Sequence, residues 1–161
     1  MWIIYETDFG ERVQASVPNT LRLSKHFVLK EVANNKAKEQ IKYISTPRTR
    51  KFMTLLEAFR EWYDDPIDPT SGYRTRSYNQ QVGGSYNSLH LDGLALDFKA
   101  LNVPERRRLE VREKWREITR SAGEIGGINY YTHGYHICIG EEKFGNKGFV
   151  TRDYRGRKHD W

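Results

Sequence analysis

The sequence predicts an α+β fold in which helices cover one face of a small antiparallel sheet and polar side chains occupy the other face. Two pairs of segments predict it. Residues 48–63 and 104–122 repeat apolar residues with the period of a helix, whereas residues 94–99 and 135–139 alternate apolar with polar residues. A chain of 161 residues has the length of one domain, which we take as residues 1–161.

The clearest helix is expected over residues 48–63. Its apolar residues fall on one stripe, and they are Phe52, Leu55, Leu56, Phe59, Trp62 and Tyr63. Pro47 stands where a helix starts and Pro66 follows its end. The second helix, over residues 104–122, turns four residues inward, namely Val111, Trp115, Ile118 and Ala122. The arginine run 106–108 is expected on its solvated face.

Alternation assigns a direction to each side chain of the two expected strands. One face receives the apolar side chains, which are Leu94, Leu96, Phe98, Tyr135, Ile137 and Ile139. Asp97 in the first strand, and His136 and Cys138 in the second, point to the opposite face. The sequence therefore predicts that chemically active groups gather on the face without helices.

The N-terminal part gives weaker signals. Residues 1–17 are interpreted as a short hairpin, with a turn near Asp8-Phe9-Gly10. One or two short helices are expected in residues 27–43, with Ser24 as a possible N-cap.

Charge and composition limit the possible partners. The chain carries 27 Lys and Arg against 21 Asp and Glu, a formal charge of +6, and ends in a basic, aromatic tail from Arg152 to Trp161. This balance favours an anionic partner, which is a nucleic acid, an anionic membrane or an acidic cell-wall polymer. Neither a secretory signal nor a membrane span is visible, and the single cysteine excludes an intramolecular disulfide framework.

His90 and Asp97 are seven positions apart, which in a straight strand would separate them by ~23 Å on opposite faces. They can share a metal ion only if the chain bends, and Asp92-Gly93 is a turn-type dipeptide. A returning strand that carries His136 would add a third ligand. Two imidazoles and one carboxylate are a common catalytic zinc set. By spacing alone, an ordinary polar contact between His90 and Asp97 and a half-buried His136 are the simpler explanation.

The motifs around His90 and Asp97 are more specific than the spacing of these two residues. They are Ser71-Gly72-Tyr73-Arg74, Tyr78-Asn79, Val82-Gly83-Gly84, and the run Ser88-Leu89-His90-Leu91-Asp92-Gly93-Leu94-Ala95-Leu96-Asp97. Their order and spacing resemble the M15 zinc metallopeptidases, which belong to a wider group with lysostaphin-type enzymes and the hedgehog signalling domain. The resemblance covers residues 21–140, including the segments Gly126 to Tyr130 and Gly134 to Ile137.

The resemblance implies that zinc is held by His90, Asp97 and His136 on the sheet face opposite the helices. It also implies that Arg74 steers a substrate carboxylate or stabilises an oxyanion, and that Ser88 hydrogen-bonds near the substrate or a ligand. The chemistry agrees, because a planar guanidinium suits a carboxylate and a cation stabilises developing negative charge. A surface ion pair for Arg74 and a turn hydrogen bond for Ser88 are the alternatives.

Two positions depart from the family pattern. Many relatives place an acidic general base three residues before the last zinc histidine, where this chain has His133. Histidine can serve as a base near neutral pH, or it can be an exposed loop residue here. Relatives often carry Asp where this chain has Cys138, a possible ligand but more simply a buried thiol. His26 and His159 are expected to be structural or exposed.

The resemblance implies a peptidase that cuts stem peptides of bacterial peptidoglycan, as a D,D-carboxypeptidase or an endopeptidase. Synthesis in the cytoplasm without a signal peptide fits a bacteriophage endolysin or a virion-associated protein. Either would act at the bacterial cell wall, and the virion-associated protein would also contact other virion proteins. The first alternative is a catalytically weak zinc-containing binding module. A nucleic-acid partner is not expected, because only the net charge supports it and no known motif is present.

Overall fold

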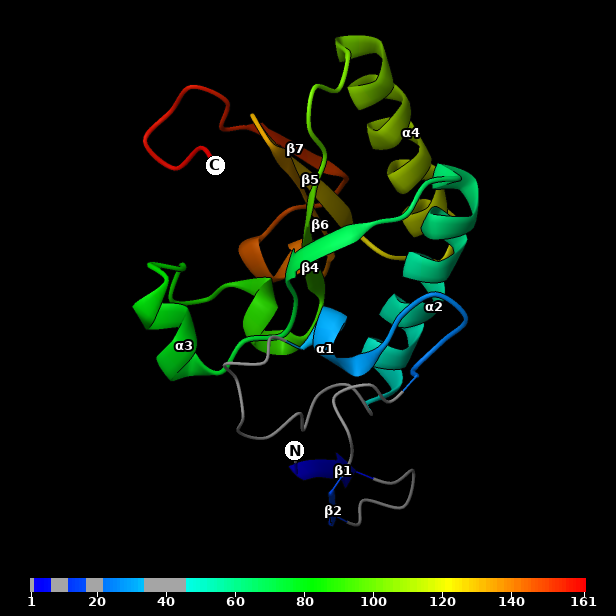
Figure 1. Cartoon of the computed structure of the whole chain (residues 1–161), viewed down its shortest axis with the longest axis vertical. Helices are drawn as coiled ribbons and strands as arrows, with labels where there is room; N and C mark the ends of the chain where they lie inside the picture. The colour runs from blue at the N-terminus through cyan, green and yellow to red at the C-terminus, as the bar shows by residue number, and fades with distance from the viewer. Residues whose placement is uncertain (1, 7–11, 17–21, 34–45) are drawn as a thin grey trace.

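The computed structural model of the protein describes residues 2–6, 12–16, 22–33 and 46–161, and the side chains of the last two ranges. Its centre is a five-stranded sheet with the strand order β3-β4-β6-β5-β7 (Figure 1). These strands are β3 (Asp68–Ser71), β4 (Ala95–Lys99), β5 (Gly126–Tyr131), β6 (Gly134–Ile139) and β7 (Val150–Asp153). The fold is therefore α+β, as the sequence predicts.

Two long helices cover one face of this sheet, α2 (Pro47–Tyr63) and α4 (Glu105–Ser121). Figure 1 shows both on one side of the strands, with α3 (Arg76–Gln81) and the C-terminal segment on the other side. The Phe59 ring lies 5.8 Å from the ring of Trp115 in α4 and 5.9 Å from that of Phe98 in β4, and all three are fully buried. Loss of one such aromatic side chain costs about 3–5 kcal/mol, so this core fixes the helices to the sheet.

Both helices begin and end as the sequence signals indicate. The Thr46 side chain accepts a hydrogen bond from the Thr49 amide at 3.2 Å, Pro47 occupies the first turn, and Asp64 ends α2 with a left-handed φ of 57°. In α4, Val111 and Trp115 are fully buried, as expected.

The expectation for the arginine run 106–108 is wrong at one position. Arg108 is only 4% exposed, and its guanidinium donates hydrogen bonds to the carbonyl groups of Tyr131 and Thr132 at 3.1 and 3.2 Å. Arg106 is exposed and Arg107 is half-buried. Arg108 is buried because its guanidinium donates to two carbonyl groups at the end of β5 and in the β5–β6 turn, and a buried guanidinium needs such acceptors.

The register of the sheet aligns one polar residue from each strand. Ser71 is opposite Asp97, Asp97 opposite His136, His136 opposite Asn129, and Asn129 opposite Arg152. Directly paired residues point to the same face of a sheet. The five residues therefore form a polar row across the sheet, on the face away from α2 and α4. Pairing is antiparallel except between β5 and β7, where it is parallel, contrary to the expectation of a purely antiparallel sheet.

The remaining elements are short. They are β1 (Trp2–Glu6), β2 (Arg12–Ser16), α1 (Leu29–Val32), the 3₁₀ turn η1 (Leu89–Asp92) and the 3₁₀ turn η2 (Glu141–Phe144). β1 and β2 pair antiparallel, as the expected hairpin requires, while its turn lies outside the described residues. Residues 34–43 of the expected helical region lie outside them too. Ser24 is not an N-cap: Val28 precedes α1, and the Ser24 hydroxyl donates to Glu57.

None of the helices in the described part of the chain has both the length and the apolar character needed to cross a bilayer.

Candidate metal centre

The polar row opens into a cleft with a volume of about 820 Å³. Strands β4, β5, β6 and β7 supply its floor through Asp97, Asn129, His136 and Arg152. Loops supply its walls, from residues 82–88 on one side and from residues 159–161 on the other. A substrate can therefore reach the sheet face directly.

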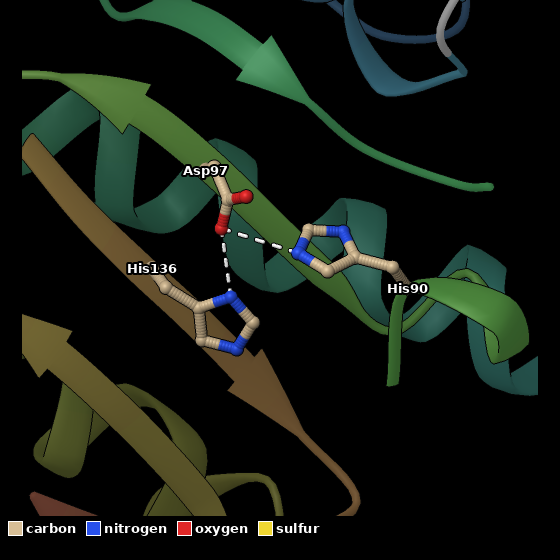
Figure 2. A group of neighbouring side chains, drawn as sticks. All are labelled: His90, Asp97 and His136. Atoms are coloured by element: carbon tan, nitrogen blue, oxygen red, sulfur yellow. Dashed lines mark hydrogen bonds and ion pairs between the residues drawn. The ribbon is translucent and has the colours of Figure 1, made fainter. Parts of the chain in front are cut away.

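Three possible metal ligands meet in this cleft. Figure 2 shows the Asp97 carboxylate facing one ring nitrogen of His90 and one of His136. Asp97 Oδ1 lies 3.2 Å from His90 Nε2 and 2.7 Å from His136 Nδ1, and one ligand atom from each residue falls within 4.8 Å of the other two. His90 and Asp97 are buried, while His136 is half-buried beside the cleft. The structure thus brings together the three residues that the sequence predicts as ligands.

The turn that makes this possible lies between His90 and Asp97. The Ser88 hydroxyl accepts a hydrogen bond from the His90 amide at 3.2 Å and so caps η1. Gly93 ends η1 with a φ of 70°, a conformation that glycine adopts without strain. The chain then enters β4, which carries Asp97. The expected bend at Gly93 is confirmed.

The ring of His90 is held in one orientation by its second nitrogen. His90 Nδ1 lies 2.7 Å from the carbonyl oxygen of Gly72, which can only accept, so Nδ1 carries the proton. Burial lowers the pKa of His90, although Asp97 opposes this shift. In the neutral ring, Nε2 then carries a lone pair, and this lone pair faces Oδ1 of the Asp97 carboxylate. Two acceptors at this distance fit a shared cation, and a ligand histidine normally donates its other N–H in this way.

Asp97 is ionised despite its burial. Burial opposes the charged form, but the two neighbouring imidazoles, with the hydrogen bond between Asp97 and His136, hold the pKa of Asp97 well below its ordinary value. Arg74 adds a hydrogen bond from Nη2 to Asp97 Oδ2 at 3.1 Å. A carboxylate that is permanently charged, with one oxygen facing two imidazoles, has the chemistry of a metal ligand.

Arg74 is half-buried, and its guanidinium has three intramolecular partners. Nε donates to Ser71 Oγ at 2.8 Å, Nη1 is 3.4 Å from Asn79 Oδ1, and Nη2 binds Asp97. The alternative of a surface ion pair is therefore wrong. A guanidinium has five N–H groups, so two have no hydrogen-bond partner among the described residues.

Two glycines of the family motifs are required by close packing. A Cβ atom on Gly72 would lie 2.1 Å from the carbonyl oxygen of Val32, so α1 could not approach β3. A Cβ atom on Gly84 would lie 2.0 Å from Oδ1 of Asn79, the residue that contacts Arg74. Asn79 is a site residue beyond those predicted from the sequence, and its place in the Tyr78-Asn79 motif is the signal that could have identified it.

Cys138 lies on the same face as His136 but has other partners. Its thiol donates weakly to Glu141 Oε1 at 3.5 Å and to the Gly127 carbonyl at 3.7 Å. Burial, together with the Glu141 carboxylate, raises the pKa of the Cys138 thiol well above its ordinary value. A metal ligand must be a thiolate, so the reading of Cys138 as a buried thiol fits better. Glu141 is held by Arg152, at 2.7 and 2.9 Å.

The structure does not bring His133 into the cleft. It occupies the turn between β5 and β6 with an exposed side chain, while its backbone N–H donates to the Trp161 carbonyl at 2.9 Å. His159 does line the cleft and is exposed there. The sequence predicts only a structural or exposed role for His159, because no local motif links the C-terminal tail to the distant segment around His90.

A second group of possible ligands joins His26, which precedes α1, to Glu57 and Glu61 of α2. Its members are already paired. His26 Nδ1 lies 2.7 Å from Glu57 Oε2, and Lys25 Nζ lies 2.6 Å from Glu61 Oε1. This group attaches the segment before α1 to α2, in agreement with a structural His26.

Fold and cleft together define an α+β protein with a candidate metal centre on the open face of its sheet. The model of the peptidase M15 family matches residues 25–138, which is most of the chain and includes all three candidate ligands. The chain belongs to the peptidase M15 family. A comparison with curated proteins finds no match.

Proposed function

We propose that the protein is a zinc-dependent peptidase that hydrolyses a peptide bond in the stem peptides of bacterial peptidoglycan. The observation that carries the proposal is the convergence of His90 Nε2, Asp97 Oδ1 and His136 Nδ1 at the base of an open cleft. Family membership supports peptidase chemistry. The positive charge of the chain favours an anionic polymer such as the cell wall.

In this proposal His90, Asp97 and His136 hold the zinc ion. Bound zinc would supply Lewis acidity for attack of water on a peptide carbonyl. Arg74 fixes Asp97 through Nη2 and directs its remaining N–H groups to a substrate carboxylate or oxyanion. Ser88 borders the cleft and caps η1, so it orients His90 and is also available to the substrate.

Proton transfer requires a general base near the metal centre. The spacing from His136 nominates His133, whereas its exposed position in the β5–β6 turn gives it no contact with the cleft. The variant His133→Ala decides between them. A rate loss of ~10²–10⁴ with zinc retained would assign the base to His133. From its position we expect a rate near wild type, which would move proton transfer to another group.

The proposal is tested by zinc content and by hydrolysis of purified peptidoglycan with and without a chelator. We expect one zinc per chain, loss of most zinc in His90→Ala and Asp97→Ala, and hydrolysis that stops on chelation. His26→Ala is the matched control, since it alters the second group on α2 and should keep both zinc and activity. Unchanged zinc in both cleft variants, or zinc lost only in His26→Ala, would refute the assignment.

A second candidate is a zinc-containing binding module with weak or no catalysis. His133 and Cys138 favour it, because His133 replaces the acidic base of many relatives and Cys138 replaces an Asp. Zinc binding without release of muropeptides would support it. For the active enzyme we further propose a bacteriophage endolysin or a virion-associated wall-degrading protein. Mass spectrometry of digested muropeptides would identify the bond and separate D,D-carboxypeptidase from endopeptidase activity.

A further inference from the structure

Tyr131 borders the cleft at the end of β5 and has no role in the proposal above. It lies two residues after Asn129, so both side chains point to the same face of the sheet. Asn129 is directly opposite His136 in the β5–β6 register. The Tyr131 side chain therefore belongs to the face that carries the candidate metal ligands.

Two other aromatic rings fix the orientation of the Tyr131 ring. It stacks on Tyr154 with a centroid distance of 5.5 Å and planes 12° apart. It also packs against Trp161 with a centroid distance of 5.0 Å and planes 30° apart. Trp161 is itself tied to the β5–β6 turn, because its carbonyl accepts the His133 N–H at 2.9 Å. A ring that contacts two neighbours in this way presents its hydroxyl in one direction only.

The surroundings of the hydroxyl favour the protonated form. Burial raises the pKa of Tyr131 to about 12, and the negative charge of Asp97 acts in the same direction, while the Asn129 amide opposes them. Tyr131 lines the same cleft as Asp97 and His136, which places it beside the candidate metal centre. At physiological pH the hydroxyl is therefore a neutral hydrogen-bond donor beside the site.

The amide of Asn129 completes this arrangement. Asn129 is only 9% exposed, and its Oδ1 atom has no hydrogen-bond partner among the residues that the structure describes. Asn129 and Tyr131 are separated by one residue in β5 and both line the cleft, so the amide side chain is a neighbour of the phenol on that face. Buried polar atoms without a partner are uncommon and concentrate at functional sites. Asn129 is thus a positioning residue for the phenol rather than a part of the folding core.

We propose that Tyr131 is a further catalytic residue, whose hydroxyl donates a hydrogen bond to the carbonyl oxygen of the scissile peptide as that oxygen gains negative charge. The inference rests on the proposed peptidase function. The phenol keeps its proton throughout, so no bond is made or broken at Tyr131. It supplies a second donor in addition to Arg74, and a fixed donor aimed at developing charge is an effective form of transition-state stabilisation.

The test uses the zinc-loaded full chain and the variant Tyr131→Phe, which keeps the ring and removes only the hydroxyl. We expect kcat on the cleaved muropeptide to fall about 10²-fold with KM changed less than about threefold. Binding of a phosphinic-peptide analogue of the cleaved bond, which mimics the tetrahedral transition state, should weaken by a similar factor. Zinc content and melting temperature should match the wild type.

Tyr130→Phe is the matched control, because it removes a hydroxyl from the neighbouring residue on the other face. That hydroxyl donates to the Arg108 carbonyl at 3.3 Å, far from the chemistry. We expect unchanged turnover and analogue binding. If Tyr131→Phe also turned over at the wild-type rate, or if it lost activity together with zinc or folding, the inference would be overturned while the peptidase assignment stood.

A readout that a structural role cannot reproduce comes from 3,5-difluorotyrosine at position 131, which lowers the phenol pKa with little change in shape. Activity should then fall as pH rises through the new pKa, because the phenolate cannot donate. A pH profile that matches the wild type would overturn the inference. A zinc-loaded wild type that cleaves no muropeptide would instead remove the proposed function, and this inference with it.

Discussion

Arg74→Lys is the most informative single substitution at the site, because it keeps the charge and removes the planar fork. The guanidinium joins three separate parts of the site, namely Ser71 in β3, Asn79 in α3 and Asp97 in β4. A lysine ammonium is one compact group at the end of a flexible stem. It can keep the contact with Asp97 but cannot reach all three acceptors at once.

The expected cost follows from the bonds that are lost. A hydrogen bond from a charged donor contributes about 1.5–3 kcal/mol, and the bond to Ser71 at 2.8 Å belongs to this class. The contact with Asn79 at 3.4 Å is near the limit of a hydrogen bond and adds about 0.5 kcal/mol. We therefore expect Arg74→Lys to lower the free energy of unfolding by about 2–3.5 kcal/mol, equivalent to a fall of about 4–14 °C in melting temperature.

Urea unfolding of the metal-free variant measures this cost without a contribution from zinc. Zinc content should stay at one per chain, because all three ligands are unchanged, while turnover should fall markedly. Arg76→Lys is the control on the exposed surface of α3, where we expect a change within about 0.5 kcal/mol. Equal stability and equal turnover in Arg74→Lys and wild type would show that the planar fork is unimportant, and would refute this account of the motif.

Three further predictions follow from other contacts. Gly72→Ala should destabilise the fold by more than about 2 kcal/mol in thermal or urea unfolding, since its Cβ would meet Val32 O at 2.1 Å, whereas Gly148→Ala, with open space around it, should be nearly neutral. Hydrogen bonds from Thr132 lower the pKa of Asp160 to about 2 from an ordinary value of 3.8, so Asp160 stabilises the fold above pH 3.8 and loses this effect as pH falls through 2. Melts of Asp160→Asn should therefore show a lower melting temperature at pH 7 and a difference from wild type that vanishes below about pH 2. Chelation should lower the melting temperature. If zinc was present at 100 times its Kd, its removal lowers the free energy of unfolding by about 2.7 kcal/mol. An unchanged melting curve would contradict a metal that joins β4, β6 and η1.

Local patterns were sufficient to predict the elements that bury their own apolar residues. The stripe of α2, the inward residues of α4 and the alternation in β4 and β6 are each complete within one segment. The bend at Gly93 was also predictable, because a turn dipeptide precedes a strand.

Features that depend on distant partners could not be predicted in this way. Three consecutive arginines look alike in α4, and only the carbonyl groups of the β5–β6 turn select Arg108 for burial. The strands β3 and β7 have few apolar residues, and they exist because a neighbouring strand offers hydrogen bonds. The C-terminal wall of the cleft has no local signal, so neither His159 nor Trp161 was assigned to the site.

The polar row has a consequence for folding that concerns strand pairing rather than chemistry. Asp97 and His136 are direct partners between β4 and β6, and a slip of one residue would turn one of them into the helix-facing layer. Only one alignment of these strands therefore places a carboxylate and an imidazole side by side. An ion that binds there stabilises that alignment over every misaligned pairing of the same two strands, and so acts as a template for the native sheet as well as a cofactor.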